Sequence, residues 1–302
     1  MTSFPTFHTI DLNFQGLPGT IAAYLIPHSG GAALVESGPG STTSHLKAAL
    51  KAYHLEIEDI SHVFLTHIHL DHAGAAGWLA QHGAKIYVHP VGAPHLVNPE
   101  KFIASATRLY GDKMEQLWGD FLPVPEDKLV VLQDGDTVEI DSFQVRAIET
   151  PGHASHHLAY RLGDLCFSGD IGGVRLAEQQ LIRLPTPPPE FQPELWRMSI
   201  RWLQAENFSH IAPTHFGIFA DAEAHLASLM KGLERIESWI EAVMPENPPL
   251  DQLRQAFIAW EREDGLQQGL PETILRDYET ANPSFMSADG ILRYWKKVRL
   301  GN

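Results

Sequence analysis

The feature that most constrains this chain is a six-residue run, His67-Ile68-His69-Leu70-Asp71-His72. Apolar residues before the run indicate a strand, and small residues after it indicate the start of a helix. Three imidazoles and one carboxylate at such a turn form a donor set that suits borderline divalent cations. In extended or turn backbone the first two histidines point the same way, whereas the aspartate and the last histidine reach a neighbouring position. The density of the cluster, with Gly74 permitting close approach, favours a metal site over solvated loop histidines.

Strand and helix patterns follow one another along the chain in two similar successions. Strands are expected at about 6–14, 20–26, 32–35, 62–66, 84–89, 128–132, 137–140, 143–149, 158–161, 165–168 and 210–213, and helices at about 42–53, 74–82, 193–206 and 222–243. This order favours an α/β chain in which two sheets pack face to face and helices flank them.

Two segments depart from this pattern. Residues 91–124 contain two short helical stretches, 99–110 and 113–118, and are interpreted as an insertion or a lid. A proline-rich break follows residue 244, so residues 1–244 are expected to form the catalytic domain and 245–302 a helical C-terminal extension. The sequence leaves open whether that extension covers a cleft, pairs subunits or shields apolar surface. It also leaves open whether the chain self-associates.

Composition narrows the class of partner. With 22 Lys and Arg against 37 Asp and Glu, the net charge of -15 disfavours nucleic acid and anionic membranes. A single cysteine, Cys166, excludes an intramolecular disulfide and lies in an apolar segment typical of a buried, inert thiol. No run of 18 apolar residues and no signal-peptide pattern is found, so a cytoplasmic protein acting on a small molecule is expected.

The run matches the H-x-H-x-D-H signature, and the chain resembles the metallo-β-lactamase superfamily over about residues 6–243. Three later segments resemble the family's remaining ligand loops in the same order: Thr150-Pro151-Gly152-His153, Phe167-Ser168-Gly169-Asp170 and Pro213-Thr214-His215. The resemblance implies an αββα sandwich with a two-metal centre.

Carried over residue by residue, the resemblance assigns His67, His69 and His153 to a first metal and Asp71, His72 and His215 to a second, with Asp170 bridging them. Two divalent ions, zinc first with iron or manganese as alternatives, would lower the pKa of a shared water enough to form a bridging hydroxide near neutral pH. Asp71 and Asp170 are expected to orient that nucleophile or to pass on its proton.

The expected reaction is hydrolysis of an ester, thioester, lactone or related bond. Other branches of the family fit less well: flavodiiron proteins carry Glu where this chain has His69, and glutathione-linked members carry a Gly- and Arg-rich segment that 171–176 does not reproduce. Nuclease and secreted β-lactamase functions are disfavoured by the charge and by the absence of a signal-peptide pattern. Two alternatives stay open: a mononuclear iron persulfide dioxygenase using His67, His153 and Asp170, and a non-catalytic metal-binding protein.

Substrate-contacting residues are less constrained. His157, His89 and Tyr110 are candidates for the pocket or for support of the ligands, with a structural role favoured for His157. The adjacent His156 is expected to point the other way on a strand. Either the insertion's aromatic residues or the proline-rich loop 185–191 could wall a substrate cleft.

Overall fold

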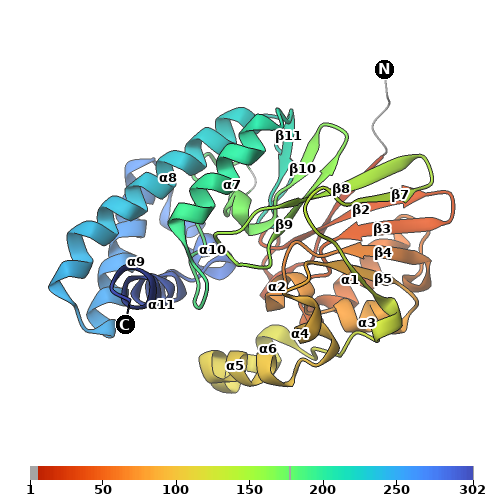
Figure 1. Cartoon of the computed structure of the whole chain (residues 1–302), viewed down its shortest axis with the longest axis horizontal. Coiled ribbons are helices and arrows are strands. Elements are labelled where there is room, and N and C mark those ends of the chain that lie inside the picture. Colours follow the sequence, from red (N-terminus) through yellow and green to blue (C-terminus); the bar gives the residue numbers. More distant parts are fainter. Residues whose placement is uncertain (1–5, 177, 302) are drawn as a thin grey trace.

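Eleven strands form two sheets that pack face to face in the computed structural model, which describes residues 6–176 and 178–301 (Figure 1). The first sheet runs in chain order: β1 (His8–Asp11), β2 (Ala22–His28), β3 (Gly31–Val35), β4 (Ile60–Phe64), β5 (Lys85–Val88) and β6 (Leu129–Val131). Strands β1 to β3 are antiparallel and β3 to β6 are parallel. Because β6 pairs with β5, the insertion between them leaves and rejoins the same sheet.

The second sheet has the order β11-β10-β9-β8-β7. Its strands are β7 (Thr137–Ile140), β8 (Phe143–Glu149), β9 (Leu158–Leu162), β10 (Leu165–Phe167) and β11 (His210–Ala212). All pairs are antiparallel except β10 with β11.

Three apolar interfaces separate four layers. Tyr24, Phe64, Tyr160 and Phe167 lie between the sheets. Helices α1 (Thr43–Lys51) and α3 (Ala76–Gln81) cover the outer face of the first sheet, and α7 (Pro193–Ala205) and α8 (Ala222–Val243) cover the second. A strand with helices on one side and a sheet on the other is buried on both faces, so β2 reads as a continuous apolar segment instead of alternating. The αββα sandwich expected from the sequence is confirmed.

The helix after the histidine run begins earlier than predicted. Helix α2 (Leu70–Ala73) starts within the run, and α3 follows it after a break at Gly74-Ala75. The backbone N–H groups of His72 and Ala73 both donate to the carbonyl of His69, which closes the first turn. Asp71 and His72 therefore lie on helix, where the sequence predicted extended or turn backbone. A β-carbon on Gly74 would lie 2.7 Å from Pro39 Cα, so only glycine fits this approach.

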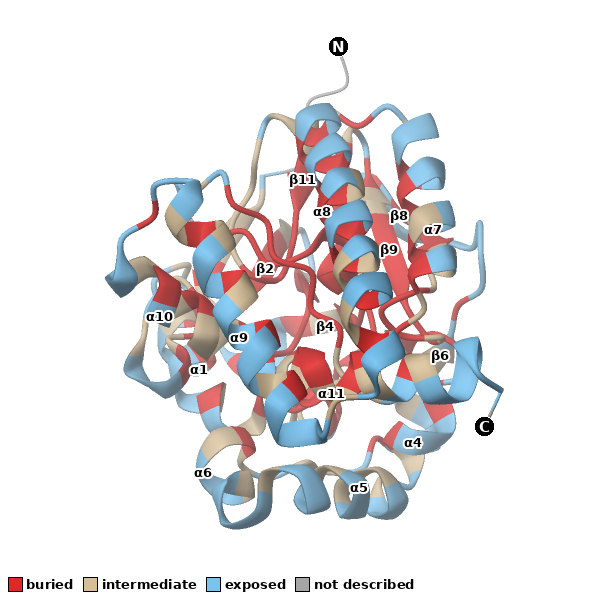
Figure 2. Ribbon diagram, turned by 90° about the vertical axis from the view of Figure 1, so that its left-hand side faces the viewer, coloured by how far each residue is buried: buried red, intermediate tan, exposed pale blue. Residues whose placement is uncertain are grey.

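The insertion contains one helix more than predicted: α4 (Ala93–Val97) precedes α5 (Glu100–Tyr110) and α6 (Met114–Trp118). No residue of α5 is buried, and Figure 2 shows this helix in the intermediate and exposed colours only.

Three C-terminal helices follow: α9 (Leu250–Gln267), α10 (Glu272–Ala281) and α11 (Ser284–Tyr294). Helices α9 and α11 share an apolar cluster with α8, in which Leu253 and Phe257 lie together with Leu229 and Leu233. Helix α10 instead packs through Leu275 and Tyr278 in a separate cluster with Leu181. No helix of residues 6–176 and 178–301 is long and apolar enough to cross a bilayer. Cys166 is buried and unbridged, as predicted, and burial raises the pKa of its thiol.

Candidate metal centre

Four loops converge at one edge of the sandwich. The histidine run follows β4, His153 follows β8, Asp170 follows β10 in a short turn (Gly169–Gly172), and His215 follows β11. These strands end at a common edge because β8, β10 and β11 run the same way in their sheet, as β3 and β4 do in theirs. All seven predicted ligands meet there, in three groups whose donor atoms lie within 4.8 Å of one another: His67, His69 and His153; His67, His72 and Asp170; and Asp71, His72 and His215.

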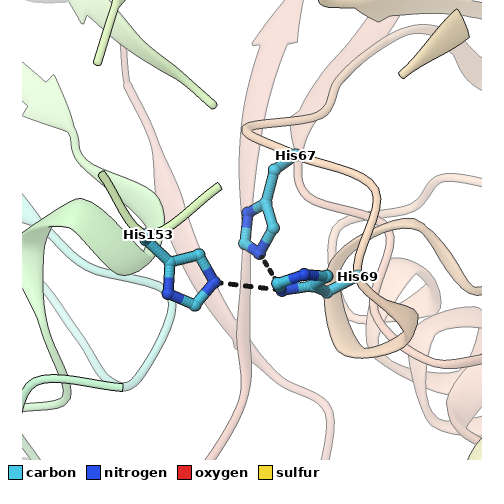
Figure 3. Close-up of side chains that lie close together, drawn as sticks. All are labelled: His67, His69 and His153. Carbon is cyan, nitrogen blue, oxygen red and sulfur yellow. Dashed lines mark hydrogen bonds between the residues drawn. The ribbon is translucent and has the colours of Figure 1, made fainter. Parts of the chain in front are cut away.

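The first group is a triangle of imidazole nitrogens (Figure 3). His69 Nδ1 lies 2.9 Å from His67 Nε2 and 3.0 Å from His153 Nε2. Two nitrogen ligands of a tetrahedral zinc ion stand about 3.3 Å apart, so the triangle is close to the size that zinc requires. Burial and the neighbouring imidazoles hold the pKa of His67 and His69 well below the usual range, so both rings are in the neutral form that binds metal.

Asp170 joins this triangle to the remaining ligands. Its Oδ2 lies 3.4 Å from His153 Nε2, whereas its Oδ1 lies 3.3 Å from His72 Nε2 and 3.5 Å from His215 Nε2. Asp71 Oδ2 lies 3.3 Å from His215 Nε2 and 3.5 Å from His72 Nε2. The two oxygens of Asp170 thus face two different donor groups, which is the arrangement that a bridging carboxylate needs.

The residues present fit two divalent cations. His72 Nε2 and Asp170 Oδ1 are buried without a hydrogen-bond partner among the described residues, and such atoms are costly to leave unmatched unless a cation satisfies them. Burial raises the pKa of Asp71 and Asp170, but the surrounding imidazoles outweigh it and lower both values, so both carboxylates stay ionised. Two anionic ligands offset part of the charge of two cations.

Hydrogen bonds behind the site orient four of the histidines so that Nε2 faces inward. In each case the Nδ1–H group donates to a fixed oxygen: His67 to Thr66 Oγ1 (3.0 Å), His72 to Glu36 Oε1 (3.0 Å), His153 to Pro185 O (2.9 Å) and His215 to Thr20 O (2.7 Å). Such partners fix both the tautomer and the angle of each ring.

Glu36 is the supporting residue that sequence reasoning missed. It is fully buried directly after β3 and adopts a left-handed backbone with φ 68°. Its Oε1 accepts hydrogen bonds from Thr66 Oγ1 (2.5 Å) and Thr214 Oγ1 (2.9 Å) as well as from His72. Glu36 therefore ties together the loops that precede His67 and His215. The signal available in the sequence was a lone acidic residue at the end of an apolar strand, Leu34-Val35-Glu36.

Of the other histidines considered from the sequence, some lie at the cavity and others do not. His157 is buried behind His67, with ring centroids 5.1 Å apart, and its Nδ1 bonds Thr150 Oγ1 at 2.8 Å. His89 Nε2 lies 3.0 Å from Glu149 Oε1, and His89 is not among the residues that line the cavity over the metal centre. His156 does line that cavity, contrary to prediction, because it lies in a turn before β9 where the alternation of a strand does not apply.

A cavity of about 580 Å³ opens over the cluster and is lined by the predicted ligands His69, Asp71, Asp170 and His215. Tyr110, one of the candidates for the pocket, lines it, and so do prolines of the 185–191 loop. The Tyr110 hydroxyl lies 3.5 Å from Met286 Sδ, so the insertion meets helix α11 beside this cavity.

The two-sheet sandwich and the histidines and aspartates gathered at one of its edges together indicate the class of protein. Residues 16–207 match the family model of the metallo-beta-lactamase superfamily, and the chain belongs to that superfamily. The resemblance stated from the motifs is confirmed. A solved metallo-beta-lactamase family protein from Thermus thermophilus, TTHA1429, superposes with a TM-score of 0.67 at 20% identity, covering 97% of this chain and 94% of that one. This likeness extends the shared fold to the C-terminal helices.

Curated relatives match over shorter stretches. The metallo-beta-lactamase fold-containing protein ST1585 of Sulfurisphaera tokodaii is 28% identical over 48% of this chain and 56% of its own length. An atrochrysone carboxyl ACP thioesterase of Aspergillus fumigatus is 31% identical over 45% and 35%, and a probable polyketide biosynthesis zinc-dependent hydrolase, BaeB, of Bacillus velezensis is 29% identical over 40% and 42%. The chain thus spans about half or less of the length of these relatives.

Proposed function

We propose that this chain is a hydrolase that uses two divalent metal ions to cleave an ester, thioester, lactone or related bond of a small molecule. The observation that carries the proposal is Asp170, whose two oxygens face separate groups of histidines. A single metal ion held by His67, His69 and His153 would leave the donor atoms of Asp71, His72 and His215 without a cation to bind.

In this proposal His67, His69 and His153 hold one ion, Asp71, His72 and His215 hold the other, and Asp170 serves both. When bound, such ions lower the pKa of water and polarise the carbonyl that is attacked. The donor set contains imidazole and carboxylate without thiolate, which favours zinc and is also compatible with iron or manganese.

The two aspartates have different positions. The Asp170 side chain is 5% exposed and both of its oxygens face histidines, so its role is to hold and to bridge. The Asp71 side chain is 20% exposed and lines the cavity, so it can also orient a water and accept its proton.

Three findings support hydrolysis of a small molecule. Matched relatives include a thioesterase and a zinc-dependent hydrolase. The 580 Å³ cavity is also within the range of small-molecule sites, and the net charge of -15 opposes a nucleic-acid substrate.

The test is metal analysis of protein purified without added metal, combined with an ester, thioester and lactone panel. About two ions per chain and turnover that Asp170→Ala abolishes are expected. One iron per chain with oxygen consumption on a persulfide would instead identify a dioxygenase. Stoichiometric metal with no turnover on any compound would identify a metal-binding protein without catalysis.

A further inference from the structure

The cavity over the metal centre has two mainly apolar walls. On one side stand residues of α5 and α6, among them Phe102, Ala106 and Leu109. On the other side stand the prolines at 187–189 and residues that join α10 to α11, including Pro283. Away from the metal ligands these walls are mainly apolar.

The α5 wall is incomplete as it stands. Phe102, Ala106 and Leu109 recur at helical spacing and form one apolar face; Phe102 and Ala106 are half-buried against the core, and Leu109 is 37% exposed. An amphipathic helix gains stability by burying such a face, and here the face borders a cavity that leads to the ligands. An apolar group bound in the cavity would complete that burial.

The opposite wall is rigid. A β-carbon on Gly290 of α11 would lie 1.9 Å from Thr186 O, and Ser287 Oγ accepts a hydrogen bond from the Thr186 backbone N–H at 3.3 Å. The prolines beside Thr186 restrict the backbone further. The proline-rich loop is therefore a preformed surface, which lowers the entropic cost of binding an apolar chain against it.

Two arginines give the cavity a preference for anionic groups. Arg108 and Arg293 line the same cavity, and both are exposed. Most arginines of the described chain form salt bridges with carboxylates, but these two do not; Arg293 Nε donates to Pro189 O at 3.0 Å. The cavity's acidic residue apart from the metal ligands, Glu190, already accepts a hydrogen bond from the backbone of Ser155.

We infer that the substrate is an amphipathic acyl ester or thioester: its apolar chain lies between α5 and the proline-rich loop, and an anionic group lies near Arg108 and Arg293. This inference rests on the hydrolase function proposed above and names its substrate class. The volume of about 580 Å³ accommodates a medium-length acyl chain together with a leaving group.

The first measurement compares acetyl, butanoyl, hexanoyl and octanoyl esters of 4-hydroxybenzoate with the matched esters of neutral 4-hydroxybenzamide, using zinc-loaded protein. Each added methylene should raise kcat/KM about fourfold until the cavity is filled, since burying one methylene contributes about 0.8 kcal/mol. The benzoate esters should be preferred about fivefold, the contribution of one exposed charge pair.

Two pairs of variants assign these effects to the walls. Ala106→Phe fills the cavity and should lower kcat/KM for the octanoyl ester at least tenfold while sparing the acetyl ester; its control is Ala104→Phe, on the exposed face of the same helix. Arg108→Gln should reduce the preference for the anionic esters, whereas Arg201→Gln, an equal charge change on α7 outside the cavity, should leave it intact.

Binding provides a readout that does not need turnover. The dissociation constants of acetate, butanoate, hexanoate and octanoate for the zinc-loaded protein should fall along the series, and Ala106→Phe should flatten the trend. If esters are hydrolysed with no dependence on chain length, or if neutral and anionic esters are used equally, the inference is overturned while the hydrolase function stands. If no ester is hydrolysed but binding still follows chain length and Ala106→Phe flattens it, the pocket is supported and the hydrolase function fails.

Discussion

Replacing Glu36 by Gln tests whether metal affinity depends on a residue that touches no metal. The substitution keeps the size of the side chain but removes the charge that accepts hydrogen bonds from Thr66, Thr214 and His72. In glutamine an NH₂ group takes the place of Oε2, which accepts a hydrogen bond from the Thr66 backbone N–H at 3.3 Å, and an NH₂ group cannot accept it. At least one hydrogen bond is therefore lost, and those that remain are no longer charge-assisted.

The expected loss follows from these contacts. A hydrogen bond to a charged group contributes about 1.5–3 kcal/mol, roughly twice the contribution of a neutral one. Part of this loss appears as a less ordered ligand loop and part as weaker orientation of His72. Removing the partner of a metal-binding histidine commonly lowers metal affinity about 10- to 100-fold, which is about 1.4–2.7 kcal/mol. We expect Glu36→Gln to fall in this range, with the lost affinity assigned to the site that contains His72.

The assay is competitive zinc titration against a chromophoric chelator, which resolves two stepwise affinities. Glu58→Gln, an exposed acidic residue changed in the same way, is the control. Denaturant unfolding of the metal-free proteins separates a stability effect from an effect on metal binding. If both stepwise affinities of Glu36→Gln stay within twofold of wild type, Glu36 does not orient the ligands and the reasoning fails.

Three further predictions concern other contacts. Asp170→Ala should remove most bound metal and nearly all activity, whereas His157→Ala should leave the metal content near that of wild type; plasma emission analysis checks both, and two metals retained in Asp170→Ala would contradict the bridging role. Gly290→Ala should cost about 1–3 kcal/mol of stability in denaturant unfolding, since its new methyl group would overlap the carbonyl of Thr186, and an unchanged midpoint would show that α11 yields easily. Burial raises the pKa of Glu261 to about 7 in the folded protein, so the folded state favours the protonated form and wild type loses stability as the pH rises from about 4.5 to 7, by at most about 3 kcal/mol. The melting temperature of Glu261→Gln relative to wild type should therefore rise between pH 5 and pH 8, and a difference that does not vary with pH would refute this account.

Local patterns were enough for much of the architecture. Strands β7 and β8 and helix α8 have the bounds that the sequence predicted, because alternation and helical spacing are properties of neighbouring residues. The seven residues nominated as ligands came from the resemblance of four short motifs to the family, and each motif is a run of neighbouring residues; the fold brings all seven to one edge.

Tertiary contacts decided the rest. Whether His156 or His89 faces the cavity depends on a turn and on a partner, Glu149, that is 60 residues away. Glu36 bonds Thr66 and Thr214, which lie 30 and 178 residues away, and no window of sequence contains such a pair. The cavity is bounded by the insertion, the 185–191 loop and the segment that joins α10 to α11, and Tyr110 of the insertion contacts Met286 of α11. The sequence by itself therefore determined the sandwich and nominated the side chains of the candidate metal centre, because both depend on patterns of neighbouring residues. The support of those ligands and the space in front of them were decided only by the folded chain, because they depend on distant residues brought into contact.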